Sequence, residues 1–134
     1  MIVRRREVIH LRSDAEIVRA RQAVRAMCAE CGFSLVDQTK LVTASSELAR
    51  NTLVHGLGGT VTLELLEDEP RRGVRLLFED HGPGIADIAR ALQDGYSTGR
   101  GMGLGLPGSR RLVNEFELIS EVGVGTRVTV VRWR

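Results

Sequence analysis

The stretch VRLLFEDHGPGI, residues 74–85, joins an apolar run to a loop that contains an acidic residue and two glycines. The apolar run predicts a strand, which places Asp80 at the end of the strand, where the chain leaves the sheet. An ionised Asp only accepts hydrogen bonds, so in a pocket it suits a donor such as the exocyclic amine of adenine. Gly82 and Gly84 allow the backbone to approach a flat ring or to turn sharply beside it. Taken alone, the stretch also fits an ordinary polar turn.

A second glycine-rich stretch, GRGMGLG at residues 99–105, precedes a predicted helix with Pro107 in its first turn. Free N–H groups at the start of such a helix can bind phosphate oxygens. Residues 103–108 also fit the dinucleotide fingerprint, but they do not directly follow a strand, which argues against that interpretation. The Walker phosphate loop is excluded, because the only lysine, Lys40, lies in a predicted helix. Any phosphate bound here is therefore held by another architecture.

A third motif lies in the helix predicted from Leu35 to His55. Glu47, Asn51 and His55 are spaced by four residues, so their side chains project along one stripe of this helix. A carboxylate one turn before an amide suits a hard cation such as Mg²⁺ with its waters, and the Glu could also take a proton from an attacking hydroxyl. A solvated helix face is the alternative interpretation of this spacing taken alone.

The remaining periodicity predicts an α/β chain that forms one domain over residues 1–134. We expect a two-layer sandwich of α/β (α+β) class, in which helices cover one face of a mixed sheet. The predicted elements are a strand at 2–11, a helix that begins with a Ser13–Glu16 capping box and stops at Gly32, the helix at 35–55, a hairpin of strands 58–68 and 71–80, and two C-terminal strands around the turn Gly123–Gly125.

Composition excludes several classes of function. The formal net charge of +2 is spread along the chain and only 4% of residues are aromatic, so neither a basic patch nor stacking side chains indicate nucleic-acid binding. The sequence contains no apolar run long enough for a secretory signal or a membrane span. We therefore expect a cytoplasmic protein that binds neither nucleic acid nor membrane.

Both cysteines lie in CAEC, residues 28–31. A structural zinc site needs about four ligands, and the three histidines are scattered elsewhere in the chain. A redox pair favours a helix N-terminus, whereas this stretch is predicted to form the last turn of a helix. We interpret Cys28 and Cys31 as two small residues on a buried helix face.

The three motifs, in this order, resemble the boxes of a known family. SSELARNTLVHG (45–56) is similar to the N-box, EDHGPGI (79–85) to the first glycine box and GRGMGLGLPG (99–108) to the second glycine box of the Bergerat-type GHKL ATP-binding fold, which histidine kinases, gyrase and MutL share. LARN, DGYST and GLPGSRRLVNEF look most like the small serine kinases of bacterial partner-switching modules, the RsbT-type switch kinases. The resemblance covers nearly the whole chain and implies ATP and Mg²⁺ as cofactors.

The resemblance also implies roles for individual residues. Glu47 would be the general base for the substrate hydroxyl, Asn51 the Mg²⁺ ligand and His55 a contact on the phosphate side. Asp80 would bind the adenine amine, and Thr126 in GVGTRV would reach adenine through a water. Further implied nucleotide contacts are Gly82 and Gly84 around the base, Gly101, Gly103, Leu104 and Gly105 around the phosphates, and Ser97, Thr98 and Arg100 in a lid formed by residues 95–100, with Arg100 neutralising the terminal phosphate.

The implied reaction is transfer of the γ-phosphoryl group of ATP to a serine of a STAS-domain antagonist protein. This transfer would free the kinase to activate a PP2C-type phosphatase, and a stressosome scaffold is a further candidate partner. Two alternatives remain open. The chain could be a related anti-sigma factor kinase that sequesters a sigma factor, or a non-catalytic module that binds ATP and a partner without phosphoryl transfer.

Overall fold

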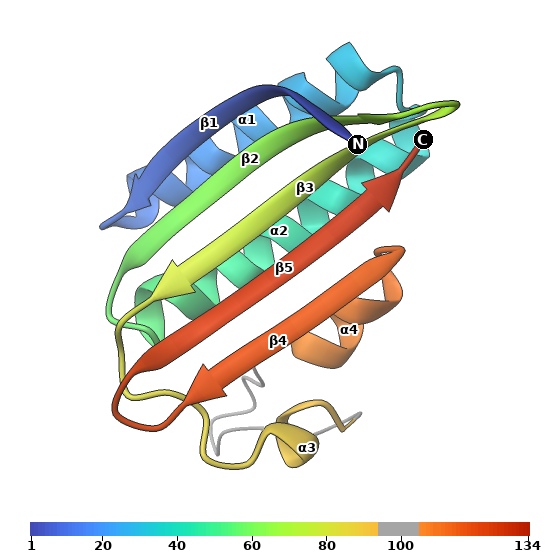
Figure 1. The fold of residues 1–134 in the computed structure, drawn as a ribbon. Coiled ribbons are helices and arrows are strands. Elements are labelled where there is room, and N and C mark those ends of the chain that lie inside the picture. Colours follow the sequence, from blue (N-terminus) through green and yellow to red (C-terminus); the bar gives the residue numbers. More distant parts are fainter. Residues whose placement is uncertain (94–104) are drawn as a thin grey trace.

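The computed structural model describes residues 1–93 and 105–134, and the elements in these ranges form two layers (Figure 1). One layer is a five-stranded sheet, and the long helices α1 and α2 cover one of its faces, which confirms the predicted two-layer α/β class. In chain order the elements are β1 (Ile2–Leu11), α1 (Asp14–Cys31), α2 (Leu35–Val54), β2 (Gly59–Asp68), β3 (Arg71–Asp80), α3 (Ile88–Ala91), α4 (Leu106–Arg111), β4 (Glu115–Glu121) and β5 (Gly125–Trp133).

The sheet has the strand order β1-β2-β3-β5-β4, and every strand pair in the described ranges is antiparallel. The expected mixed sheet is therefore wrong. β3 and β4 do run in the same direction, but β5 lies between them and pairs with both (Figure 1). The second strand of the C-terminal hairpin, β5, lies beside β3, so no two neighbouring strands of the described sheet are parallel.

Local signals set the ends of α1. The Glu16 carboxylate accepts hydrogen bonds from the Arg12 backbone N–H (3.1 Å) and the Ser13 hydroxyl (3.0 Å), but the Ser13 side chain caps no helix N–H, so the predicted reciprocal capping box does not form. At the other end Gly32 adopts φ +85°, a left-handed conformation that glycine tolerates without strain. The Phe33 N–H then donates to the Cys28 carbonyl and closes the helix.

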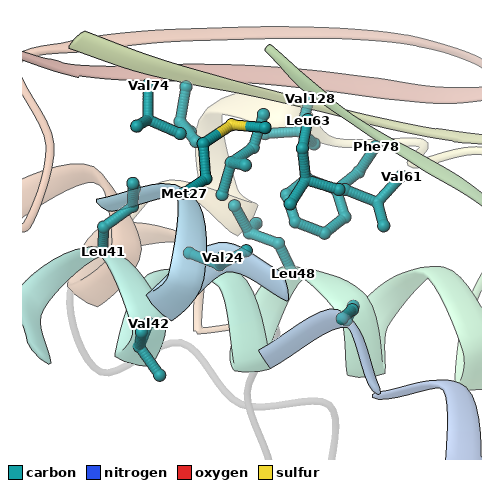
Figure 2. Close-up of a cluster of buried hydrophobic side chains, with 14 of the residues drawn as sticks. Val24, Met27, Leu41, Val42, Leu48, Val61, Leu63, Val74, Phe78 and Val128 are labelled. Atoms are coloured by element: carbon teal, nitrogen blue, oxygen red, sulfur yellow. The ribbon is translucent and has the colours of Figure 1, made fainter. Parts of the chain in front are cut away.

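The hydrophobic core lies between the sheet and the two long helices (Figure 2). A buried aliphatic or aromatic side chain of this size stabilises the native state by about 1.5–3 kcal/mol relative to an exposed one. The core residues labelled in Figure 2 are Val24 and Met27 of α1, Leu41, Val42 and Leu48 of α2, and Val61, Leu63, Val74, Phe78 and Val128 of the sheet.

Cys28 and Cys31 are both free and buried in the last turns of α1. Burial in the apolar core raises the pKa of the Cys28 thiol to about 12 and also raises the pKa of Cys31. In the described ranges no group of three or more His, Cys, Asp or Glu side chains could hold a metal ion. The interpretation of the cysteines as core residues is confirmed.

We expect both thiols to resist alkylation in the native protein, because the reactive thiolate is suppressed by burial. Iodoacetamide at about pH 8 should label neither cysteine of the folded chain and both in denaturant, as read by intact mass. Rapid labelling of the folded chain at either position would contradict the buried assignment.

A carboxylate is buried on the sheet face that the helices leave open. Glu64 of β2 accepts hydrogen bonds from Arg6 of β1 (Nη2 to Oε2, 2.6 Å) and from Arg75 of β3 (Nε to Oε1, 2.6 Å), and only 7% of its side chain is exposed. Burial alone raises the pKa of Glu64, but the hydrogen bonds from Arg75 and Arg6 together outweigh it and hold the pKa below its ordinary value. The ionised carboxylate therefore ties three strands together.

Glu64→Gln should lower the free energy of unfolding at neutral pH by about 1–3 kcal/mol. A depressed native pKa means that this stabilisation is complete above the ordinary pKa of 4.5 and is lost as the pH falls through the lower native value. Urea unfolding from neutral to acidic pH should therefore show a flatter pH dependence in Glu64→Gln than in the parent. The exposed Glu117→Gln is the control, and identical pH profiles for all three chains would contradict the assignment.

Candidate functional site

Three of the chain segments singled out by the sequence meet at one end of the sheet and line a pocket. They are the C-terminal half of α2, the end of β3 with the loop that follows it, and the start of β5 (Figure 1). The pocket holds about 420 Å³ of space between atoms, part of it open to solvent. Its lining residues are Leu48, Asn51, Thr52, His55, Gly56, Phe78, Asp80, Ile85, Leu106, Thr126 and Val128.

Asp80 and Thr126 lie opposite each other on β3 and β5. The Oδ1 atom of Asp80 accepts hydrogen bonds from the Gly82 N–H (2.9 Å) and the Thr126 N–H (3.3 Å). These two bonds fix the orientation of the carboxylate at the pocket wall. A carboxylate held this way accepts hydrogen bonds only, so it suits an amine donor of a ligand and disfavours a keto oxygen.

Close packing against the Asp80 side chain requires glycine at position 56 and, next to it, at position 82. A Cβ on Gly56 would clash with the Asp80 carboxylate, and a Cβ on Gly82 would come within 2.6 Å of the Gly56 carbonyl oxygen. Gly84 adopts φ +79°, so the loop turns sharply there as the sequence predicts. The sequence did not identify Gly56 as a site residue, because a glycine directly after a predicted helix is already explained as the residue that ends the helix.

The predicted stripe on α2 reaches the pocket with two of its three side chains. Asn51 and His55 line the pocket, whereas Glu47 lies one turn earlier and is exposed. A Cβ on Gly105 would lie 2.6 Å from the Glu47 Oε2 atom, so this carboxylate adjoins the end of the second glycine-rich stretch. The structure therefore brings the N-box residues and the start of α4 together.

Several predicted contacts lie outside the described residues. They are Ser97, Thr98, Arg100, Gly101, Gly103 and Leu104, together with the rest of the expected lid at 95–100. Gly105, the last glycine of the stretch, is described and adopts φ +66° immediately before α4. Leu106 follows it and contributes its buried side chain to the pocket lining.

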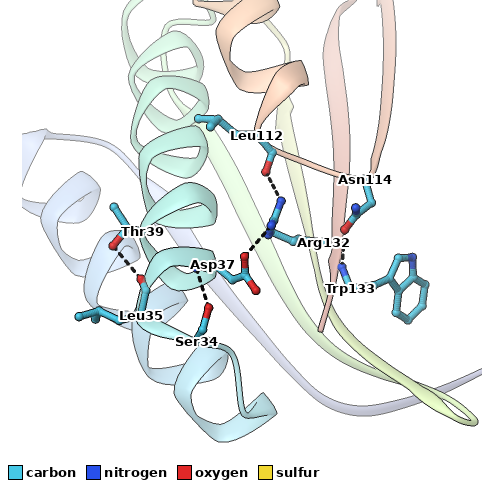
Figure 3. A network of polar contacts seen from close by, with 8 residues as sticks. All are labelled: Ser34, Leu35, Asp37, Thr39, Leu112, Asn114, Arg132 and Trp133. Carbon is cyan, nitrogen blue, oxygen red and sulfur yellow. Dashed lines mark hydrogen bonds and ion pairs between the residues drawn. The ribbon is translucent and has the colours of Figure 1, made fainter.

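An arginine with 14% of its side chain exposed fixes α4 relative to α2 (Figure 3). The Arg132 guanidinium donates to the Leu112 carbonyl oxygen at the end of α4 (2.9 Å) and to the Asp37 carboxylate in the first turn of α2 (2.7 Å). The hydrogen bond from Arg132 is the main cause that lowers the pKa of Asp37. This bridge holds α4 where Gly105 can lie against Glu47.

The hydroxyl of Ser120 on β4 is a second feature that the sequence did not single out. It lies 2.7 Å from the Thr126 hydroxyl and accepts a hydrogen bond from the Ile85 N–H (2.8 Å). The only sequence signal is positional, because Ser120 precedes Thr126 by six residues across a predicted hairpin turn and so pairs with it.

The fold is that of an ATPase family. Residues 36–134 match the family described as "Histidine kinase-, DNA gyrase B-, and HSP90-like ATPase", and the chain belongs to it. In the described ranges no helix is both long and apolar enough to cross a membrane.

Similar proteins indicate which type of protein this chain is within the family. Serine/threonine-protein kinase RsbT of Bacillus subtilis (strain 168) is 42% identical over 125 residues, which cover 93% of this chain and 94% of RsbT. The Anti-sigma F factors of Anoxybacillus flavithermus and Halalkalibacterium halodurans are 28% and 30% identical, over 84% and 81% of this chain and 81% and 78% of their own lengths. The chain is thus a member of the serine/threonine-kinase type within this ATPase family.

Gly56→Ala should weaken ATP binding at least about tenfold, because the new methyl group displaces the Asp80 carboxylate, which is expected to accept a hydrogen bond from the base, and a lost charged hydrogen bond costs about 1.5–3 kcal/mol. Isothermal titration with ATP measures the effect, and thermal melting shows that the variant is folded. Gly108→Ala is the matched control, since its Cβ meets nothing within 4 Å. Equal affinities in the two variants would contradict the packing argument.

Proposed function

We propose that this chain transfers the γ-phosphoryl group of ATP to a serine of a STAS-domain antagonist protein in a partner-switching module. Phosphorylation of the antagonist would release the kinase, which then activates a PP2C-type phosphatase. The observation that supports this most directly is the arrangement of the pocket. Asp80 and Thr126 form one end, and the polar stripe of α2 leads from the pocket to an exposed carboxylate at Glu47.

The two ends of the site suit the two ends of ATP. Asp80 offers an acceptor to the adenine amine, and the apolar side chains of Leu48, Phe78 and Val128 offer flat contact to the base. Asn51 lies toward the second glycine-rich stretch, on the side where Glu47 adjoins Gly105. The triphosphate would therefore run from Asp80 towards the start of α4.

The residues present fit a magnesium ion that is bound mainly by substrate. Asn51 supplies a hard amide oxygen, and the described residues provide no cluster of three acidic or imidazole ligands. Mg²⁺ typically keeps several waters and binds through one or two protein oxygens together with substrate phosphates. When bound, the ion would neutralise charge on the β- and γ-phosphates.

Catalysis would consist of positioning and proton removal. The exposed Glu47 carboxylate is open to a docked protein, so it would accept the proton of the acceptor serine hydroxyl. The serine oxygen then forms a bond to the γ-phosphorus, the bond to the bridging oxygen breaks, and ADP leaves with that oxygen.

Because ATP is the phosphoryl donor, we expect the reaction to take place in the cytoplasm. A stressosome scaffold is a further proposed partner.

An anti-sigma factor kinase is the second candidate function. It is favoured by the similarity to several Anti-sigma F factors over about four fifths of the chain. This alternative predicts that the chain copurifies with a sigma factor from its own cells. The remaining alternative, an ATP-binding module without phosphoryl transfer, predicts that signalling survives replacement of Glu47.

The proposed reaction is tested by intact mass of a purified STAS-domain partner after incubation with the kinase and Mg-ATP. We expect one added phosphate with the parent chain, none with Asn51→Ala, and transfer slowed by roughly 10²–10⁴-fold with Glu47→Gln, because the base is lost while ATP still binds. Thr43→Ala, exposed one turn before Glu47 on the same helix, is the control. Full transfer by Glu47→Gln would contradict the role of the base, and no transfer by an ATP-bound parent would favour the alternatives.

A further inference from the structure

Helix α4 is too short to hold its own position. It has six residues, and isolated helices of fewer than about 12 residues are marginal in water. The buried residues of this helix are Leu106 and Ser109, and the Ser109 hydroxyl has no hydrogen-bond partner within the described part of the chain. The place of α4 therefore depends strongly on the contacts at its two ends.

The first end of α4 meets the candidate base and the pocket. Gly105 caps the helix, and a Cβ at this glycine would lie 2.6 Å from Glu47 Oε2, so the carboxylate packs directly over the Gly105 backbone. Leu106, the first residue of the helix, lines the pocket. Gly105 also ends the stretch that is expected to contact the phosphates. The distance from Gly105 to Glu47 therefore bears on how the phosphates lie relative to the base.

The second end of α4 is held by Arg132 of β5 (Figure 3). Its Nη1 atom donates to the Leu112 carbonyl oxygen (2.9 Å), and its Nη2 atom donates to Asp37 Oδ1 (2.7 Å). With 14% of its side chain exposed, Arg132 makes these bonds where water screens them little. A guanidinium is a planar fork with a fixed spacing between its nitrogens, so it sets the distance between its two partners.

Arg132 thereby ties α4 to the same helix that carries Glu47. Asp37 and Glu47 both belong to α2, ten positions apart (37 to 47), which is about 15 Å along the helix axis. Helix α4 is thus referenced to α2 at two places, at Asp37 through Arg132 and at Glu47 through Gly105.

Two further hydrogen bonds near this end of α4 reach β5. The Asn114 N–H donates to the Val131 carbonyl oxygen (2.9 Å), and the Trp133 N–H donates to Asn114 Oδ1 (2.7 Å, Figure 3). These bonds fix the chain after α4 on the sheet. Arg132 adds the link to α2, which the position of Glu47 requires.

We propose that Arg132 is a positioning residue for phosphoryl transfer, which keeps the start of α4 at a fixed distance from the Glu47 carboxylate. The proposal rests on the role of Glu47 as the base given above. Arg132 acts through α4 and does not line the pocket. A base must lie within hydrogen-bond reach of the proton that it takes, so a misplacement of about 1 Å slows transfer without abolishing ATP binding.

The test measures the single-turnover rate of phosphate transfer to the STAS-domain partner at saturating Mg-ATP, by intact mass. Arg132→Lys keeps the charge but cannot span both partners, so the rate should fall roughly ten- to hundredfold. The dissociation constant of ATP, measured by isothermal titration, should change far less, because the Asp80 end of the pocket is unaltered. Arg127→Lys is the matched control, since Arg127 is exposed on the opposite face of β5 and pairs with Glu79 (3.5 Å), and it should match the parent.

A second comparison separates positioning from a merely structural role. In a Glu47→Gln background the base is absent, so Arg132→Lys should cause little further loss of rate. The same fold-loss in both backgrounds overturns the proposal, as does a fall in ATP affinity as large as the fall in rate. A folded Arg132→Lys that transfers phosphate at the parent rate overturns it too.

Hydrogen exchange gives a readout that does not depend on activity. The Ser109 N–H donates to the Gly105 carbonyl oxygen (2.9 Å) and the Leu112 N–H to the Ser109 carbonyl oxygen (3.1 Å). Both amides should exchange faster in Arg132→Lys than in the parent, and unchanged exchange would speak against the proposal. Should Arg132→Lys fail to fold by thermal melting, Asp37→Ala, which removes the α2 partner of the fork, takes its place in all of these measurements.

The Glu47→Gln variant alone tests the underlying role of the base. If it transfers phosphate at the parent rate, Glu47 is not the base, and the role of Arg132 fails with it. If Glu47→Gln is slow while Arg132→Lys matches the parent or loses the same factor in both backgrounds, the role of Glu47 stands and only the role of Arg132 is wrong.

Discussion

The antiparallel pairing of β5 with β3 is the interaction on which the pocket depends. It places Thr126 opposite Asp80 across 46 positions of sequence, and the β4–β5 hairpin brings Ser120 alongside. Without β5 between β3 and β4, the pocket would lose one complete wall. Contacts so distant in sequence close long loops and are therefore expected to form late in folding. The binding site is thus completed by the last strand of the described chain.

The helix α2 serves the core and the site at once. Its apolar side packs under the sheet, and Leu48 belongs both to the core and to the pocket lining. Phe78 of β3 does the same from the opposite layer. The floor of the pocket is therefore the edge of the hydrophobic core, and packing between the layers fixes the distance from Asn51 to Asp80. Protein cores are close-packed and resist local rearrangement, so the geometry of the site is set by the fold.

The sequence predicted those features of the structure that depend on residues close together in the chain. The stop of α1 at Gly32 and the position of Asp80 at a strand end depend on neighbouring residues in the sequence, and the structure confirms both. The stripe on α2 reaches the pocket with Asn51 and His55. The antiparallel sheet and the crowding of Gly56 against Asp80 depend on contacts between distant segments, which periodicity does not report. The pairing of Ser120 with Thr126 follows from the predicted hairpin, whereas its hydrogen bond from the Ile85 N–H joins segments 35 residues apart and carries no local signal.

The Arg132 bridge gives α4 the properties of a short lever. The helix has six residues, or about 9 Å of length, and Arg132 pins its far end through the Leu112 carbonyl. Its near end begins at Gly105, which lies against Glu47. A displacement at Gly105 would turn α4 about its pinned end rather than shift it as a whole, because Arg132 holds Leu112 in place. The side chain that meets this rotation first is the carboxylate of Glu47, so the positions of α4 and of that carboxylate are mechanically linked.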